Sequence, residues 1–241
     1  MDYAIQTDHL TKTFGNFTAV NAISFEVAPG EIFGFLGANG AGKTTALKML
    51  TGLLKPSSGQ AWVAGIDVTR KPEHVKRRIG YMSQKFSLYE DLTVRENIRL
   101  YGGIYGLKRA DIKSKTTTLL EKLQLEPYAD QLVVGLPLGW RQKLAFSVAL
   151  LHEPRIVFLD EPTSGVDPLT RRQFWDLIYE AAHTGVTLMV TTHYMDEAEY
   201  CNRVSIMVDG KIEALDTPRN MKKAFAATDM DEVFRKLARE A

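Results

Sequence analysis

The chain has 241 residues, 45% apolar and 24% charged, a composition typical of a globular protein with a sizeable core. Its 30 Lys and Arg residues nearly balance its 29 Asp and Glu residues, and the net charge of +1 gives no reason to expect a nucleic-acid partner. Cys201 is the only cysteine, which excludes an intrachain disulfide and a cysteine-rich metal site and favours a reducing cytosol.

Along the chain, short apolar runs alternate with helical patterns. Runs rich in β-branched and aromatic residues predict strands at 22–27, 31–36, 155–159, 187–192 and 204–208. The last three are almost continuously apolar, as in a parallel sheet buried on both faces. One helix is predicted to begin at Lys43, and another to begin at Pro168, capped by Asp167, and to stop near Gly185. The alternation predicts a layered α/β core.

The middle of the chain, roughly residues 88–152, is predicted to be helical. Thr93 and Glu96 form a capping box at the start of a helix over 93–107. Two further amphipathic stretches lie at about 109–125 and 139–152. We therefore expect a helical subdomain inserted into the α/β core.

A single domain is expected to cover residues 1–241. Its core comprises 1–87 and 153–225, its helical subdomain 88–152, and its C-terminal helix 228–241. One face of that last helix is apolar and consists of Met230, Val233, Phe234 and Leu237. The pattern fits either a docking helix or a solvated amphipathic tail.

The strongest chemical signal is GANGAGKTT at residues 37–45, which fits G-x-x-x-x-G-K-[ST] between a predicted strand and a predicted helix. Its glycines let the backbone wrap closely around phosphate oxygens at a helix N-terminus. Lys43 is expected to reach the β/γ-phosphates, and Thr44 to offer its hydroxyl to Mg²⁺. The residues expected to line the nucleotide site are Gly37, Ala38, Asn39, Gly40, Ala41, Gly42, Lys43, Thr44 and Thr45.

A second signal is RIVFLDE at residues 155–161, a buried strand that ends in two carboxylates. Asp160 is expected to hold Mg²⁺, directly or through water, and Glu161 to polarise the attacking water. A solvated turn is the alternative, which the upstream phosphate loop disfavours. The two signals together predict a site that binds phosphate groups and Mg²⁺ and positions an attacking water.

In the order of its motifs, the chain resembles the ATP-binding subunit of an ABC transporter over nearly its whole length. The resemblance implies an α/β fold: a P-loop NTPase core with a mostly parallel sheet, an N-terminal antiparallel β subdomain and an inserted α-helical subdomain. It also implies that two such domains, identical or homologous, close head to tail over two Mg-ATP molecules. Each site would pair the phosphate loop of one chain with the signature of the other, and hydrolysis would reopen the pair.

The resemblance also assigns roles outside the two motifs. Phe14 matches the aromatic that stacks on adenine, with a simple core aromatic as the alternative. Gln84 resembles the glutamine that senses Mg²⁺ and the attacking water, and His193 the switch histidine that contacts the γ-phosphate. Asp167 resembles the aspartate of a loop that crosses to the partner. Catalysis would then rest on Glu161, His193, Gln84 and Lys43, and Mg²⁺ binding on Thr44, Gln84 and Asp160.

Residues 136–140, LPLGW, occupy the position of the family's signature, usually Leu-Ser-Gly-Gly followed by glutamine or a similar residue. Pro137 replaces the serine, Leu138 the first glycine and Trp140 the glutamine, while Gly139 remains. Gly139 is expected to contact the ATP held by the partner, and Trp140 to pack rather than touch ATP. Pro137 removes a hydroxyl and an N–H, so we expect a modified signature with fewer hydrogen bonds to phosphate.

The phrases SLYEDLTVREN, TSGVDP and TTHYMDEAE most resemble exporters of the ABC-2 type, and the modified signature resembles ATPase halves fused in tandem. Closure is expected to pass through a groove near residues 84–88 to a membrane-spanning subunit. Two alternatives remain open: a soluble ABC ATPase of the translation-factor type, and a weakly hydrolysing half of an asymmetric pair. A repair-type ABC ATPase is excluded, because the interval between Gln84 and Leu136 leaves no room for a long coiled coil.

The sequence also lacks the marks of a secreted or membrane-spanning chain. The first ten residues contain no basic stretch followed by an apolar one. The longest nearly apolar run, at residues 144–151, is far shorter than the roughly 20 residues that a membrane span needs. The chain is therefore expected in the cytoplasm, held on the inner face of the cell membrane by transporter subunits.

Overall fold

The computed structural model describes residues 3–84 and 88–240. Its central sheet has six strands in the order β10-β9-β3-β8-β7-β6. Their bounds are β3 (Ile32–Leu36), β6 (Ile79–Met82), β7 (Ile156–Asp160), β8 (Thr187–Thr192), β9 (Arg203–Val208) and β10 (Lys211–Asp216). All neighbours pair in parallel except β10, which is antiparallel to β9. The mostly parallel sheet predicted from the sequence is confirmed.

Parallel pairing brings three chemically important strand ends to one edge of this sheet. Leu36, the last residue of β3, pairs with Thr192 of β8, and Asp160, the last residue of β7, pairs with Thr191. These three strands are buried along their whole length, because structure covers both faces. The segments that follow β3, β7 and β8 therefore start side by side.

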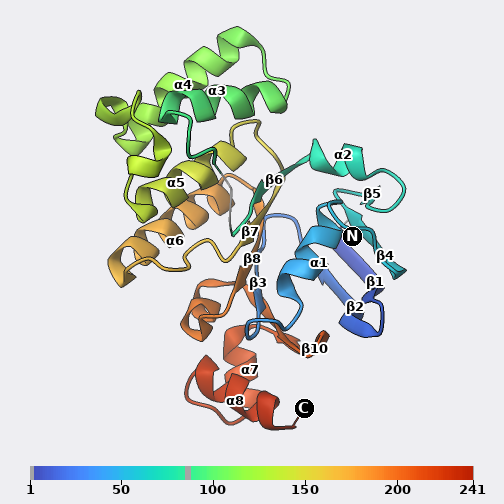
Figure 1. The fold of residues 1–241 in the computed structure, drawn as a ribbon. Helices are drawn as coiled ribbons and strands as arrows, with labels where there is room; N and C mark the ends of the chain where they lie inside the picture. The colour runs from blue at the N-terminus through green and yellow to red at the C-terminus, as the bar shows by residue number, and fades with distance from the viewer. Residues whose placement is uncertain (1–2, 85–87, 241) are drawn as a thin grey trace.

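A second, antiparallel sheet has the order β2-β1-β4-β5 and lies beside the central one (Figure 1). Its strands are β1 (Ile5–Phe14), β2 (Phe17–Val27), β4 (Ser58–Val63) and β5 (Ile66–Asp67). Phe25 stacks on Phe33 of β3 with ring centroids 5.4 Å apart, which joins the two sheets. The helix α1 (Lys43–Leu50) contributes its buried apolar side chains to the same core. The predicted N-terminal antiparallel sheet is thus present.

The helices α3 (Val94–Ile104), α4 (Arg109–Leu123) and α5 (Leu138–Ala149) lie together, away from the antiparallel sheet (Figure 1). Thr93 and Glu96 form the predicted capping box at the start of α3. The long helix α6 (Pro168–His183) is capped by Asp167, as predicted. The short helix α2 (Pro72–Lys76) precedes β6. The predicted insertion of helices is confirmed, whereas the exact domain boundaries stay a prediction.

At the C-terminus, α7 (Pro218–Ala224) and α8 (Met230–Glu240) pack together below the central sheet (Figure 1). Met230, Val233 and Leu237 of α8 are buried and belong to the main apolar core. The interpretation as a solvated amphipathic tail is therefore wrong, because the apolar face packs on its own chain. Across the described residues, no helix has the length and apolar character needed to span a membrane.

Candidate functional site

The phosphate loop connects β3 to α1 and depends on glycine at two turns. Gly40 has a φ of 85° and Gly42 a φ of 105°, both in the left-handed region that favours glycine. At Gly42, which is the N-cap of α1, a Cβ would also lie 2.3 Å from the carbonyl oxygen of Ala19. The loop can therefore fold back tightly over the start of the helix, where backbone N–H groups favour an anion.

Lys43 is the cation of this loop, and its side chain is only 4% exposed. Its Nζ donates hydrogen bonds to the carbonyl oxygens of Gly37 (2.7 Å) and Ala38 (3.0 Å) and lies 3.6 Å from Oε1 of Glu161. Burial lowers the pKa of Lys43, and the charge of Glu161 opposes that shift. The ammonium group is thus held between the phosphate loop and the carboxylates.

Asp160 is 1% exposed and is held by two hydroxyl groups. Its Oδ1 accepts hydrogen bonds from Oγ1 of Thr44 (3.1 Å) and from Oγ1 of Thr191 (2.8 Å). Burial raises the pKa of Asp160, while the two donors act in the opposite direction. Thr191 was not predicted as a site residue; the only signal in the sequence is its position near the end of an apolar strand before His193.

The pair formed by Thr44 and Asp160 fits Mg²⁺ in its donor chemistry. Mg²⁺ takes oxygen ligands, typically one or two carboxylates together with waters and phosphate oxygens. Within the described residues there is no group of three His, Cys, Asp or Glu side chains that could hold a metal by itself. A hydroxyl and a carboxylate within 3.1 Å of each other therefore suit a cation that the nucleotide would help to hold.

The side chain of Glu161 contacts three of the other predicted site residues. Its Oε2 accepts a hydrogen bond from Nε2 of Gln84 (2.8 Å) and lies 3.0 Å from Nδ1 of His193. Gln84 thus contacts Glu161, and its predicted role toward Mg²⁺ stays a prediction. The two partners come from the segments after β6 and after β8, which flank β7 in the sheet. Four of the predicted residues therefore meet here: Lys43, Gln84, Glu161 and His193.

The backbone of Glu161 is strained. Its φ is 48°, a left-handed conformation that costs a non-glycine residue roughly 1–3 kcal/mol. The N–H of Glu161 is directed at both the carbonyl oxygen (3.1 Å) and the hydroxyl oxygen (3.0 Å) of Thr191. Such strain persists only where surrounding contacts hold it, and it is common at functional sites.

The other predicted residues lie in two further places. Phe14 is 50% exposed at the β1–β2 turn, so it is not a core aromatic. Gly139 and Asp167 line one hollow of about 270 Å³ between the N-termini of α5 and α6. Asp167 Oδ1 accepts hydrogen bonds from the N–H groups of Leu169 and Thr170. Trp140 packs against the main core and meets Tyr128 edge to face, as predicted.

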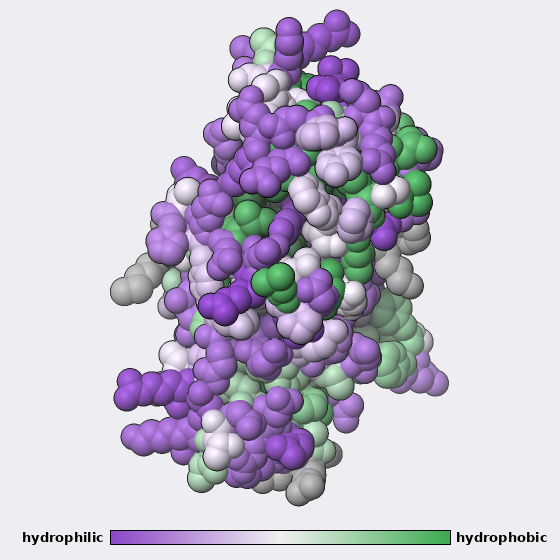
Figure 2. All heavy atoms as spheres, turned by 90° about the vertical axis from the view of Figure 1, so that its left-hand side faces the viewer, coloured by the Kyte–Doolittle hydropathy of each residue, from purple (hydrophilic) through white to green (hydrophobic). Residues whose placement is uncertain are grey.

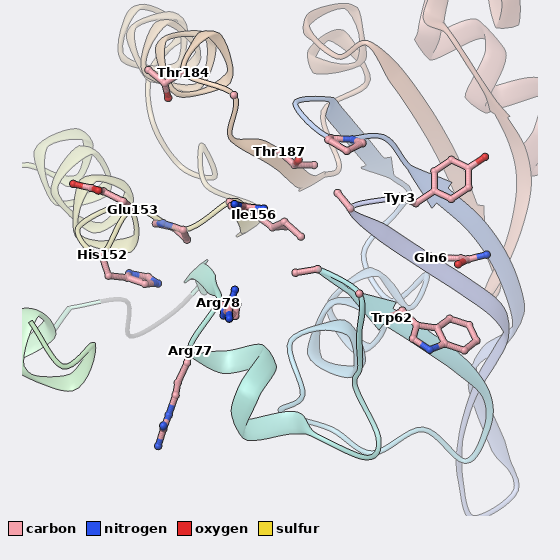
Figure 3. Close-up of a pocket in the computed structure, with 17 residues that line it drawn as sticks. Tyr3, Gln6, Trp62, Arg77, Arg78, His152, Glu153, Ile156, Thr184 and Thr187 are labelled. Atoms are coloured by element: carbon pink, nitrogen blue, oxygen red, sulfur yellow. The ribbon is translucent and has the colours of Figure 1, made fainter. Parts of the chain in front are cut away.

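A larger cavity lies elsewhere. It has a volume of about 960 Å³ and opens at the other ends of the parallel strands, beside the first residues of β7 and β8, Ile156 and Thr187 (Figure 3). Arg77 and Arg78 line it, whereas none of the predicted site residues does. Cavity size therefore does not locate the chemistry of this protein.

The sequence model of the family described as "ABC transporter" matches residues 20–164, more than half of the chain. The chain belongs to the ABC transporter family. This ABC cassette is 50% identical over 90% of its length to YbhF of Escherichia coli (strain K12), named as a probable multidrug ABC transporter ATP-binding protein. It spans only 38% of the length of YbhF.

One further relative and one solved structure match the ABC cassette over most of its length. It is 37% identical to the Nod factor export ATP-binding protein I of Paraburkholderia xenovorans (strain LB400), covering 96% of this chain and 76% of that one. It superimposes with a TM-score of 0.80, at 25% identity, on a dimeric ATP-binding cassette in a post-hydrolysis state bound to ADP and Pi. That match covers 88% of this chain and 98% of the other. The predicted fold is confirmed.

Proposed function

We propose that this chain is the ATP-binding and ATP-hydrolysing subunit of an ABC-type exporter. ATP would drive two nucleotide-binding domains into a head-to-tail dimer. The observation that carries the proposal is the convergence of Lys43, Gln84 and His193 on the carboxylate of Glu161 beside the phosphate loop. The dimer of the solved cassette supports pairing, and the names of two relatives, a multidrug transporter protein and an export protein, support export.

The proposed chemistry is hydrolysis of the γ-phosphate by water. Glu161 orients and polarises the attacking water, while Gln84 and His193 hold its carboxylate and lie close to the developing charge. Lys43 supplies a positive charge to the β/γ-phosphates. Mg²⁺, held by Thr44 and Asp160, would neutralise phosphate charge. Phe14, exposed on the β1–β2 hairpin, is available to stack on adenine. Phosphoryl transfer needs little more than positioning and electrostatics.

A membrane-spanning subunit is the proposed second partner, and it would hold the chain on the inner face of the membrane. On the helical side of the molecule, apolar residues reach an otherwise largely hydrophilic surface in separate patches (Figure 2). Exposed apolar side chains on and before α3 include Tyr89, Leu100 and Ile104, of which Ile104 is 60% exposed. Part of the predicted transmission groove, residues 85–87, lies outside the described residues. Among the described residues, a cavity of about 430 Å³ is lined by Gln84, Leu88 and Glu161.

The decisive test is Glu161→Gln, which keeps the shape of the side chain and removes its charge. We expect phosphate release to fall by roughly 10²-fold or more while Mg-ATP still binds. Glu121→Gln on the exposed face of α4 serves as the matched control and should leave turnover unchanged. Near-normal turnover in Glu161→Gln would overturn the assignment of the site.

A second candidate function, the weakly hydrolysing half of an asymmetric pair, is favoured by Pro137. Pro137 is the N-cap of α5 and offers no side-chain hydrogen bond there. The first intrahelical bonds run from the N–H groups of Trp140 and Arg141 to the Pro137 carbonyl, so the amides of Leu138 and Gly139 precede them. If both sites of a homodimer carry this signature, each ATP lacks the serine hydroxyl that the family's usual signature provides.

The double substitution Pro137→Ser with Leu138→Gly tests this candidate. In a Glu161→Gln background, which should prevent turnover, it is expected to increase the ATP-dependent dimer measured by light scattering, because a hydroxyl returns to the γ-phosphate. An unchanged dimer fraction would mean that LPLGW is a working alternative signature.

Mixing this chain with a candidate partner half that carries the serine signature provides the second test. Glu161→Gln in this chain should then remove most of the activity, and the equivalent change in the partner little.

A further inference from the structure

A carboxylate outside the proposed catalytic set is completely buried. Glu197 lies in the 3-10 helix η3 (Met195–Tyr200), which follows β8 and His193, and its side chain is 0% exposed. Burying a carboxylate is costly unless other groups compensate its charge and fill its hydrogen-bonding positions. Because the side chain of Glu197 is not exposed to solvent, any role that it has must act through its neighbours.

Two hydrogen-bond donors and one cationic group from other parts of the chain converge on one oxygen of Glu197. Its Oε1 accepts hydrogen bonds from Oγ1 of Thr163 (2.6 Å) and Nε1 of Trp175 (3.2 Å). Nε of Arg171 lies 3.7 Å from the same oxygen and supplies the opposite charge. Oε2 is buried without a hydrogen-bond partner among the described residues. The hydrogen bonds of the carboxylate therefore all involve one oxygen, which faces Thr163 and α6.

One arm of this network reaches the loop that carries Glu161. Thr163 is two residues beyond Glu161 and is 1% exposed. The loop turns at once, because the N–H of Ser164 donates to the carbonyl oxygen of Glu161 (3.2 Å) and that of Val166 to the carbonyl oxygen of Thr163 (3.4 Å). The hydroxyl of Thr163 thus anchors to Glu197 the turn that starts at the strained backbone of Glu161.

The other arm reaches the segment that carries His193. The N–H of Glu197 donates to the carbonyl oxygen of Tyr194 (3.2 Å). The guanidinium carbon of Arg171 lies 3.9 Å from the ring centroid of Tyr194, a cation–π contact. The Tyr194 ring in turn lies 4.1 Å from the ring of His193. Glu197 and Arg171 therefore fix the residue next to His193 by both its backbone and its side chain.

We propose that Glu197 is a positioning residue for ATP hydrolysis. Through Thr163, Glu197 holds the loop that carries Glu161. Through η3 and Arg171, it holds the segment that carries His193, so that the two segments keep a fixed relative position. That position keeps Nδ1 of His193 3.0 Å from Oε2 of Glu161. The inference rests on the roles proposed above for Glu161 and His193. A displacement of about 1 Å in such a pair can cost as much as 10²-fold in rate, without any loss of nucleotide binding.

The experiment uses Thr163→Val, which keeps the shape of the side chain and removes the hydroxyl that donates to Glu197. Thr163→Ser restores the hydroxyl, and Glu199→Gln, in the same 3-10 helix but on its exposed side, is the matched control. We expect kcat to fall by about 10- to 100-fold in Thr163→Val, with the KM for ATP changed less than about threefold. Thr163→Ser and Glu199→Gln should stay within about twofold of the original chain.

A second readout does not require turnover. The imidazole ¹⁵N resonances of His193, assigned by comparison with His193→Gln, should shift in Thr163→Val and in Glu197→Gln but not in Thr163→Ser or Glu199→Gln. Thermal unfolding would confirm that each variant is folded. An unchanged kcat in Thr163→Val together with unmoved His193 resonances would overturn the inference, as would a Thr163→Ser variant as slow as Thr163→Val. If Glu161→Gln itself turns over normally, it is the proposed function that fails.

Discussion

Gly139 in α5 faces Thr170 in the first turn of α6 so closely that a Cβ on Gly139 would lie 2.3 Å from Cγ2 of Thr170. The N–H and hydroxyl groups of Thr170 both donate to the carboxylate of Asp167, at 3.0 and 2.5 Å. The glycine of the modified signature and the aspartate that caps α6 are therefore packed around one threonine. Gly139 has a local packing reason to be glycine, in addition to the predicted contact with ATP of the partner.

The first prediction follows from this contact. Gly139→Ala should lower the free energy of unfolding by about 1–3 kcal/mol, because the added methyl group overpacks the interface between α5 and α6. In a Thr170→Ser background, which removes Cγ2 and keeps the hydroxyl on Asp167, the same change should become neutral or stabilise by up to about 1 kcal/mol, since alanine favours a helix over glycine. Urea unfolding of the four proteins measures this coupling; equal effects of Gly139→Ala in both backgrounds would contradict it.

Lys43→Ala tests the phosphate loop. It removes the buried ammonium group, and with it a charge-assisted contact to the nucleotide worth about 1.5–3 kcal/mol. Calorimetry with Mg-ATP should therefore show affinity weakened by roughly tenfold or more. Lys48→Ala on the exposed side of the same helix is the control and should bind as the original chain does. Unchanged affinity in Lys43→Ala would refute the placement of phosphate in this loop.

A pH-dependent prediction concerns His152, which joins the helical region to the central sheet. Its Nε2 lies 3.0 Å from the carbonyl oxygen of Ile79, and its ring stacks on Tyr105 with centroids 3.7 Å apart. Burial lowers the pKa of His152 from 6.5; the hydrogen bond with the Ile79 carbonyl opposes this shift, and the charge of Lys115 adds to it. The folded protein therefore binds this proton less readily than the unfolded chain does.

The sign of the effect follows from proton linkage. The unfolded chain takes up more protons at this site as the pH falls below 6.5, so the contribution of neutral His152 to stability is present above that pH and is lost below it. Compared with His152→Gln, the original chain should lose free energy of unfolding between pH 8 and pH 5.5. Because both proteins contain the other histidines, the contribution of those residues to the pH dependence of the free energy of unfolding cancels when the urea unfolding curves are compared. A difference that stays constant with pH would count against the burial of the ring.

The last prediction concerns the docking of α8 on its own chain. Leu237→Ala should lower the free energy of unfolding by about 2–3 kcal/mol, because it leaves a cavity beneath the helix. Arg235→Ala, at an exposed position of the same helix, should change stability by less than about 0.5 kcal/mol. Equal, small effects of the two substitutions in thermal or urea unfolding would mean that the apolar face of α8 is not packed in solution.

Features that depend on neighbours in sequence were predictable. The phosphate loop at residues 37–45 is one continuous segment whose glycine turns and helix start follow from local backbone chemistry. The capping box of α3 and the Asp167 cap of α6 are likewise made within three residues. Fully buried strands such as β7 and β8 were recognisable because they are uniformly apolar.

Two strands with few buried residues were missed. The edge strand β10 reads KIEALD, and all of its residues are exposed or half-buried, so its composition carries little strand signal. The strand β4, SGQAWV, begins with three exposed residues. Whether the apolar face of α8 meets solvent, a partner or its own chain could not be read from its periodicity, because that pattern shows only that one face is apolar.

The order of motifs along the chain indicates which residues carry the chemistry. Whether these residues lie close together depends on the order of the strands in the central sheet. Gln84, Glu161 and His193 meet because β7 lies between β6 and β8 in the sheet. Thr191 and Glu197 support the site through side-chain contacts between segments that are about 30 residues or more apart in sequence. Local propensity does not choose among such long-range pairings; burial of the parallel sheet and the satisfaction of its polar groups do.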